Sequence, residues 1–108
     1  MGIKVTIVAP GSFRTAFAGR SVVRAGREIA AYAGTAGQVR HGIAHIDGTQ
    51  AGDPAKAAQV LIDLVDAPKP PLRLALGADS VATVRHKLHK LETELTAWEA
   101  VSNSTAFD

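Results

Sequence analysis

The chain has 108 residues, 46% of them hydrophobic and 5% aromatic, and 12 Lys and Arg against 10 Asp and Glu give a formal net charge of +2. This length allows one domain with a modest core, and so small a charge gives no argument for nucleic-acid or membrane binding. The lack of cysteine excludes disulfides and thiolate catalysis, and no apolar stretch is long enough to cross a bilayer. The expected protein is soluble and cytoplasmic, and it binds neither nucleic acid nor a membrane.

The first predicted strand covers residues 3–9, "IKVTIVA", which are rich in β-branched residues. Its nearly continuous apolar character predicts a strand that is covered on both faces. Pro10 and Gly11 then end the strand in a turn.

Residues 15–33 favour a helix with a thin apolar stripe, weakened by Gly19 and Gly26. Three basic side chains would share another face of this helix: Arg20, Arg24 and Arg27. They could bind phosphate or nucleic acid, but no aromatic residues lie between them, so a solvated face is the favoured interpretation. Residues 34–52 are glycine-rich and poorly periodic, which predicts a loop with at most a short helical piece.

The clearest helix signal begins at Asp53, which can cap the first turn, with Pro54 at the first helical position. Its predicted buried face consists of Ala57, Leu61, Leu64 and Val65. The sequence "APKPP" ends the helix at residues 67–71. Residues 72–76 then alternate as a second strand, and prolines are tolerated at the point where a strand begins.

A last helix is predicted to begin with a cap at Asp79 or Ser80. Apolar residues recur along it at spacings of three and four: Val81, Val84, Leu88, Leu91, Leu95 and Trp98. A coiled-coil seam would explain this stripe, and a helix laid across a sheet explains it at least as well. Trp98 could anchor a partner, but packing on the chain's own core is the favoured interpretation. The order of elements predicts an α/β fold with two parallel strands and three to four helices, whose strand edges are unpaired.

Three stretches resemble the short-chain dehydrogenase/reductase family in order and spacing: "GIKVTIVAPGSFRT" at residues 2–15, "GDPAKAAQVLIDLVDAPKPPLRLALG" at 52–77, and "STAFD" at the end. The resemblance implies the C-terminal part of a Rossmann-like, doubly wound parallel sheet, from the sixth strand onward. The chain would then be one partial domain. Residues 1–15 would form the strand and Pro-Gly turn, 16–52 a helical region like the family's substrate flap, and 53–108 a helix, the last strand, the last helix and a tail.

The resemblance also implies hydride transfer between a carbonyl and an alcohol with NAD or NADP as cofactor. Pro10 and Gly11 match the turn that lies against the nicotinamide ring, and Thr15 matches the hydroxyl residue that contacts the carboxamide or the phosphates. Phe13 and Phe17 would line the substrate side. A Pro-Gly turn suits this role because glycine lets backbone approach a flat ring closely.

The catalytic unit of the family, Tyr-x-x-x-Lys, does not occur, because the one tyrosine, Tyr32, is followed four residues later by Ala36. The Gly-rich phosphate-binding fingerprint is also missing from the sequence. No catalytic residue is therefore assigned, and the expected protein is a truncated form that is inactive alone. The alternative is a non-catalytic module that self-associates, as a homo-oligomer, or complements a partner carrying the missing N-terminal portion.

Two histidine pairs have helical spacing, His41 with His45 and His86 with His89. Either pair could place two imidazoles on one helix face, as metal ligands require. Neither has a third ligand at a motif spacing, so solvent-facing histidines and no metal site are expected.

Overall fold

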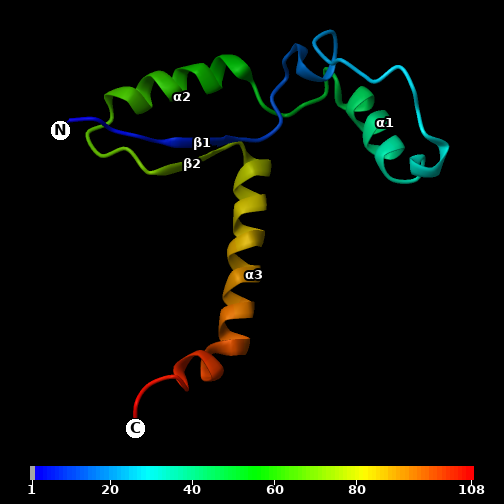
Figure 1. The fold of residues 1–108 in the computed structure, drawn as a ribbon. Helices are drawn as coiled ribbons and strands as arrows, with labels where there is room; N and C mark the ends of the chain where they lie inside the picture. The colour runs from blue at the N-terminus through cyan, green and yellow to red at the C-terminus, as the bar shows by residue number, and fades with distance from the viewer. Residues whose placement is uncertain (1) are drawn as a thin grey trace.

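The computed structural model describes residues 2–108. Its elements, in chain order, are β1 (Ile7–Pro10), two single 3₁₀ turns (Ala16–Ala18 and Ala30–Tyr32), α1 (Ala36–Ile46), α2 (Pro54–Asp66), β2 (Arg73–Leu76) and α3 (Ala78–Asn103). Figure 1 shows the two strands side by side, with α2 running along them. The helix α1 lies beyond the end of the strands that is opposite the N-terminus, and α3 extends away from the sheet. The predicted α/β arrangement, with two strands and three longer helices, is confirmed.

The two strands are parallel, with Ile7 opposite Arg73 and Pro10 opposite Leu76. Backbone hydrogen bonds continue the ladder beyond the strands at both ends, from Ile7 N to Leu72 O at 2.8 Å and from Gly11 N to Leu76 O at 2.7 Å. The first strand is shorter than predicted, because residues 3–6 have no ladder partner. The prolines before β2 lack the N–H groups that further pairing needs, and Thr6 instead donates its side-chain hydroxyl to Pro71 O at 2.7 Å. The prediction that the first strand is covered on both faces is also wrong for the described residues, since Ile7 is 52% exposed.

The helix predicted over residues 15–33 is wrong, since only the two 3₁₀ turns form there. Gly19 and Gly26 make a helix costly in this segment. Tertiary contacts also compete with it: Arg40 of α1 forms an ion pair with Glu28 at 2.9 Å and donates to Ala25 O at 3.0 Å, which holds the segment against α1. The predicted basic face therefore does not exist as a helix face.

The helix α1 is longer than the short helical piece expected within residues 34–52. Its apolar residues Val39, Ile43 and Ile46 follow the helical spacing of four and three. Two glycines inside it, Gly37 and Gly42, lowered the apparent helix propensity of the sequence.

The helix α2 begins as predicted, because Asp53 accepts a hydrogen bond from Ala55 N at 2.9 Å and Pro54 is the first helical residue. Its predicted buried face is only partly covered. Leu64 is half-buried, whereas Val65 is 78% exposed.

The helix α3 starts directly after β2, with Gly77 at its N-cap position in the positive-φ conformation (φ 108°) that favours glycine. The predicted side-chain cap is therefore wrong. Most of the apolar stripe of α3 has no covering element among residues 2–108, and Trp98 is 63% exposed rather than packed on a core.

Packing is sparse throughout the described residues. Ala18 is the one buried hydrophobic residue among them, at 3% exposure. The radius of gyration is 20.3 Å, against roughly 13 Å for a compact domain of similar length. Among the helices of residues 2–108, none combines the length and the apolar character needed to span a membrane.

Candidate functional site

A cavity of about 360 Å³ lies beside the turn that follows β1. We call it the Pro-Gly cavity, and its walls are Pro10, Gly11, Ser12, Phe13, Thr15, Phe17, Ala18, Ile43, Ile46 and Gln50. All five residues singled out in the sequence therefore line one cavity. The cavity is at the carboxyl end of a parallel strand, where open α/β sheets bind their ligands.

The first residues of α3 hold the Pro-Gly turn in place by hydrogen bonds. Ser12 N donates to Asp79 Oδ2 at 2.7 Å, and Ser80 Oγ donates to Ala9 O at 2.7 Å. A methyl group added at Gly11 would overlap the carboxylate of Asp79. A larger residue at this position would therefore displace the Asp79 carboxylate from the turn.

The same hydrogen bonds act on the acidity of Asp79. Donation from the Ser12 backbone N–H, and then from Ser80, lowers the pKa of the Asp79 carboxyl below its usual value of 3.8, while partial desolvation opposes this shift. Asp79 is therefore ionised at neutral pH and acts as an anionic acceptor for the turn.

Residues 12–15, three of which line the cavity, pair with residues 50–53, of which Gln50 lines it. Arg14 N donates to Gly52 O at 2.9 Å, and Gly52 N donates to Ser12 O at 3.0 Å. The Arg14 guanidinium adds two hydrogen bonds to Gln50 O, at 3.1 Å from Nε and 2.9 Å from Nη2. A methyl group at Gly52 would lie 2.6 Å from Ser12 O, so the two segments approach each other closely because this residue is glycine.

The predicted site residues differ in how far they are fixed. Thr15 Oγ1 accepts a long hydrogen bond from Phe17 N at 3.3 Å. Phe13 is half-buried and forms a single parallel bridge with Gly52, whereas Phe17 is 77% exposed. The turn and Phe13 are thus held in place, and Phe17 lies at the open side.

Three further residues belong to this site and were missed in the sequence as site residues: Gln50, Asp79 and Ser80. Asp79 and Ser80 looked like helix caps, and only the return of α3 to the β1 turn shows that they support it. No sequence pattern marks Gln50 as a site residue, because it lies in the glycine-rich segment that is predicted to be a loop.

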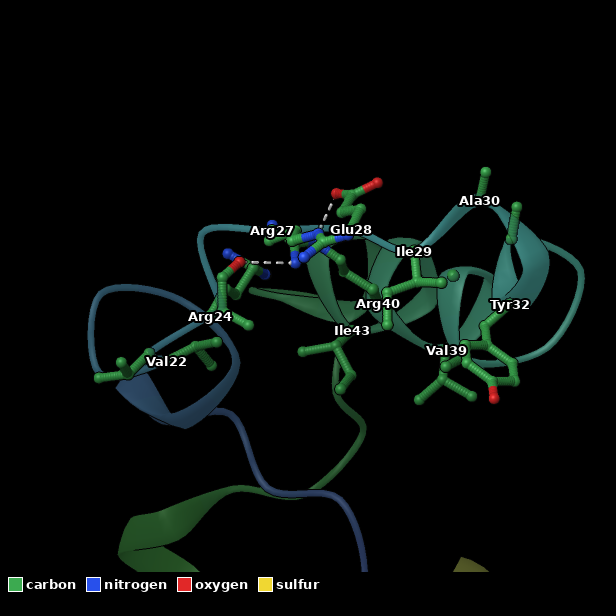
Figure 2. A pocket seen from close by; sticks show the side chains of 15 residues that line it. Val22, Arg24, Arg27, Glu28, Ile29, Ala30, Tyr32, Val39, Arg40 and Ile43 are labelled. Atoms are coloured by element: carbon green, nitrogen blue, oxygen red, sulfur yellow. Dashed lines mark hydrogen bonds and ion pairs between the residues drawn. The ribbon is translucent and has the colours of Figure 1, made fainter.

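A second cavity of about 450 Å³ lies between residues 22–33 and α1 (Figure 2). Apolar side chains, among them Val22, Ile29 and Val39, line it together with Tyr32, while Arg40 and Glu28 form its ion pair. Tyr32 therefore lies here and does not line the Pro-Gly cavity. Ile43 lines both cavities, so α1 separates them.

The histidine pairs do not gain a third ligand in the structure. Within residues 2–108, no group of three or more His, Cys, Asp or Glu side chains is placed to hold a metal ion. His45 Nδ1 is 3.0 Å from His41 O, which ties that imidazole to the backbone of its own helix.

No protein-family model matches the chain. The chain is 29% identical over 105 residues to oxidoreductase BOA17 of Botryotinia fuckeliana, covering 97% of this chain and 38% of the relative. It is 32% identical over 106 residues to an uncharacterized oxidoreductase of Schizosaccharomyces pombe, covering 98% of this chain and 36% of the relative. Among solved structures, a short-chain dehydrogenase from Streptomyces avermitilis matches with a TM-score of 0.75 and 44% identity, over 98% of this chain and 38% of that one.

The chain thus spans less than two fifths of the length of each of these relatives. The structural match confirms the predicted fold class, in which β1 and β2 are part of a larger Rossmann-like sheet.

Proposed function

We propose that this chain, which belongs to the short-chain dehydrogenase/reductase family, forms the nicotinamide-facing turn and part of the substrate cavity of an NAD- or NADP-dependent oxidoreductase. The observation that carries the proposal is the gathering of Pro10, Gly11, Phe13, Thr15 and Phe17 around one cavity at the carboxyl end of β1. The reaction would interconvert a carbonyl and an alcohol.

The residues present suit the nicotinamide end of such a cofactor. The Pro-Gly turn offers backbone rather than side chain to a flat ring, and Asp79 and Ser80 fix it before any ligand arrives. The Thr15 hydroxyl can donate its proton to a carboxamide oxygen while its oxygen accepts from Phe17 N. When bound, the nicotinamide supplies or accepts the hydride.

Two requirements of the reaction are not met by residues 1–108. The sequence has no Gly-rich turn for the pyrophosphate and no Tyr-x-x-x-Lys unit for the proton. Tyr32 is not a substitute, because it lines the other cavity. We therefore propose that these 108 residues do not transfer hydride alone, and that activity needs a segment carrying both units.

The test is complementation. Residues 1–108 are mixed or fused with a segment that carries a Gly-rich turn and Tyr-x-x-x-Lys, and the absorbance of reduced nicotinamide is followed with carbonyl substrates. We expect turnover only in the combined sample. Thr15→Val should lower kcat/KM by about tenfold or more, because one directed hydrogen bond is removed. Phe107→Ala, at the exposed C-terminal end, is the control and should have no effect.

Calorimetry on residues 1–108 provides the second measurement, with both oxidation states of each cofactor. We expect no saturable binding. Tight binding to these residues alone would contradict the proposed division of tasks, and a combined sample without turnover would contradict the proposed function.

The second candidate is a non-catalytic module that associates with itself or with a partner. The observation that favours it is the uncovered apolar stripe of α3, in which Leu88, Leu91 and Leu95 are exposed. The two candidates are compatible, because a helix that joins subunits can also complete an enzyme.

A further inference from the structure

The apolar stripe of α3 is exposed from end to end. Its members are between 39% and 63% exposed: Val81, Val84, Leu88, Leu91, Leu95 and Trp98. They lie on one helix that runs from Ala78 to Asn103, and Figure 1 shows most of this helix extending away from the sheet. A contiguous apolar face of this kind marks a surface that other protein covers. The sizes and charges of the side chains on and beside the stripe indicate which protein.

The stripe can pair with the same stripe of a second copy in either direction, because its spacings alternate between three and four residues. An antiparallel pair centred between positions 89 and 90 places every stripe residue opposite a stripe residue of the second copy, over about 25 Å of helix. The facing pairs are Val81 with Trp98, Val84 with Leu95, and Leu88 with Leu91. A small residue thus lies opposite a large one at both ends, which keeps the distance between the two helices even.

Four charged side chains flank the stripe, and in the antiparallel pair each of them meets the opposite charge. Arg85 and Glu92 lie along one side of the stripe. Lys87 and Glu94 lie along the other side. Antiparallel helices related by a two-fold axis bring the same side of each stripe together, so Arg85 of one copy meets Glu92 of the other. Lys87 meets Glu94 in the same way, and the axis repeats both contacts. None of the four side chains forms an ion pair within residues 2–108.

The same side chains disfavour a parallel pair. Parallel helices bring one side of the stripe against the other side of the partner's stripe, which places Glu94 of each copy beside Glu99 of the other. These like charges repel, and the attraction between Lys87 and Glu92 that remains only offsets them. Trp98 would also lie opposite Trp98, and Val81 opposite Val81, so the widest and the narrowest contacts would fall at opposite ends. Charge and size therefore both favour the antiparallel direction.

We propose that α3 pairs in the antiparallel direction with α3 of a second copy of this chain, through the stripe from Val81 to Trp98 and the charges beside it. The proposal rests on the self-association named above as the second candidate function, and adds to it the surface, the direction and the register. Hydride transfer plays no part in it, so its failure is distinguishable from failure of the enzymatic function.

Disulfide trapping tests direction and register together. The chain has no cysteine, so each introduced cysteine is unique. We expect a mixture of Val84→Cys and Leu95→Cys to form mainly the mixed disulfide dimer under mild oxidation at micromolar concentration, because these positions face each other. Val84→Cys alone should give at least about tenfold less dimer, since its two cysteines would be about 16 Å apart along the helices. A mixture of Thr83→Cys and Thr96→Cys, at one level of the pair but on the outer faces, is the matched control and should stay unlinked.

Reversal of the charges tests the ion pairs. Arg85→Glu together with Lys87→Glu turns every attractive contact into a repulsive one, and so does Glu92→Lys together with Glu94→Lys. We expect each double variant to associate about a hundredfold more weakly than the unmodified protein in sedimentation equilibrium, because four contacts change sign. Mixing the two double variants restores all opposite-charge contacts and should bring the association constant to within about tenfold of the original.

Lys56→Glu together with Lys90→Glu is the matched control, because it has the same formal net charge as the first double variant and does not touch the stripe. It should leave association unchanged. Three results would overturn the proposal: a Val84→Cys disulfide that forms alone as readily as the mixed one, a mixture of double variants that does not recover, or a monomeric unmodified protein. In the last case, a different protein segment covers the stripe.

Discussion

Gly11 and Asp79 are far apart in the sequence and in contact in the structure. Glycine in the turn after β1 has two possible reasons: close approach of a ligand, and the Asp79 carboxylate that a methyl group would overlap. The second is visible within the chain, where the Asp79 carboxylate accepts from Ser12 N at 2.7 Å. A loss of cofactor binding in a Gly11 variant would therefore not by itself prove contact with the cofactor.

A double-mutant cycle separates the two reasons. We expect Gly11→Ala to displace the Asp79 carboxylate and to speed the amide exchange of Ser12, which loses its acceptor. Asp79→Ala should speed it to a similar extent, and the two together should add little, because both remove one interaction. Gly2→Ala, with nothing within 4 Å of the added methyl group, is the control. Fully additive effects would contradict this contact.

The Asp79 contact also has a defined pH dependence. The pKa of Asp79 in the folded protein is lowered, chiefly by the Ser12 N–H, so its contribution to stability is complete above the unfolded value of 3.8 and is lost as the pH falls through the folded value. An NMR titration of the Ser12 amide should show a transition below pH 3.8 that is absent in Asp79→Asn. A transition at higher pH would contradict this prediction.

At the scale of elements, the sequence predicted best where a local signal and the final structure agree. Asp53 and Pro54 mark the start of α2 by local chemistry alone. The helix predicted over residues 15–33 does not form because Gly19 and Gly26 disfavour it and because Arg40 holds the segment against α1. The glycines are visible in the sequence, whereas the contacts of Arg40 are not. α1 was underestimated because its glycines hide a regular apolar spacing.

The residues of the candidate site fall into the same two groups, those marked by a local sequence pattern and those brought together by the tertiary structure. Pro10, Gly11, Phe13, Thr15 and Phe17 follow β1 directly, so the family pattern could mark them together. Gln50, Asp79 and Ser80 reach the same turn from distant parts of the chain. Their role depends on tertiary structure, which the sequence pattern did not contain.

Gly42 lies inside α1 and Gly48 lies just after it. Replacing each of them by alanine tests how far the low helix propensity of glycine limits the stability of the protein. Gly42 and Gly48 both have open space around an added methyl group, but only Gly48 has a positive φ, of 75°. We expect Gly42→Ala to raise the free energy of unfolding by about 0.5–1 kcal/mol. Gly48→Ala should lower it by about 1 kcal/mol, because an L-residue is strained there. Urea denaturation followed by circular dichroism measures both, and equal effects of the two would contradict the assignment.

For the molecule as a whole, the apolar surface is the dominant property. A single hydrophobic residue is buried among residues 2–108, while the face of α3 from Val81 to Trp98 lies open. Large exposed apolar patches mark surfaces that other protein covers. We propose that the extended shape and the exposed stripe share one cause, namely that further protein covers the elements described.

Self-association is the expected behaviour of residues 1–108 when studied alone. Light scattering at micromolar concentration should give a mass above that of one chain. Replacing Leu88, Leu91 and Leu95 together by Gln should lower the apparent association constant by at least about tenfold, because exposed leucines lose their burial between chains. Replacing Thr83, Lys90 and Thr96 of α3, which lie away from the stripe, by Gln is the matched control. A monodisperse monomer in the unmodified protein would contradict the prediction.

The pairing of β1 with β2 sets the order of events in folding. Thr6 and Pro71, which meet at the beginning of the ladder, are 65 residues apart in sequence, and closing a loop of that size costs roughly 4 kcal/mol of chain entropy. Four paired residues on each strand offer few contacts to offset this cost before neighbouring strands are present. The contact order of this pair is therefore high, and helices such as α2 form within about a microsecond while the sheet closes much later. During that interval, both strands present unpaired edges that chaperones or neighbouring nascent chains can bind.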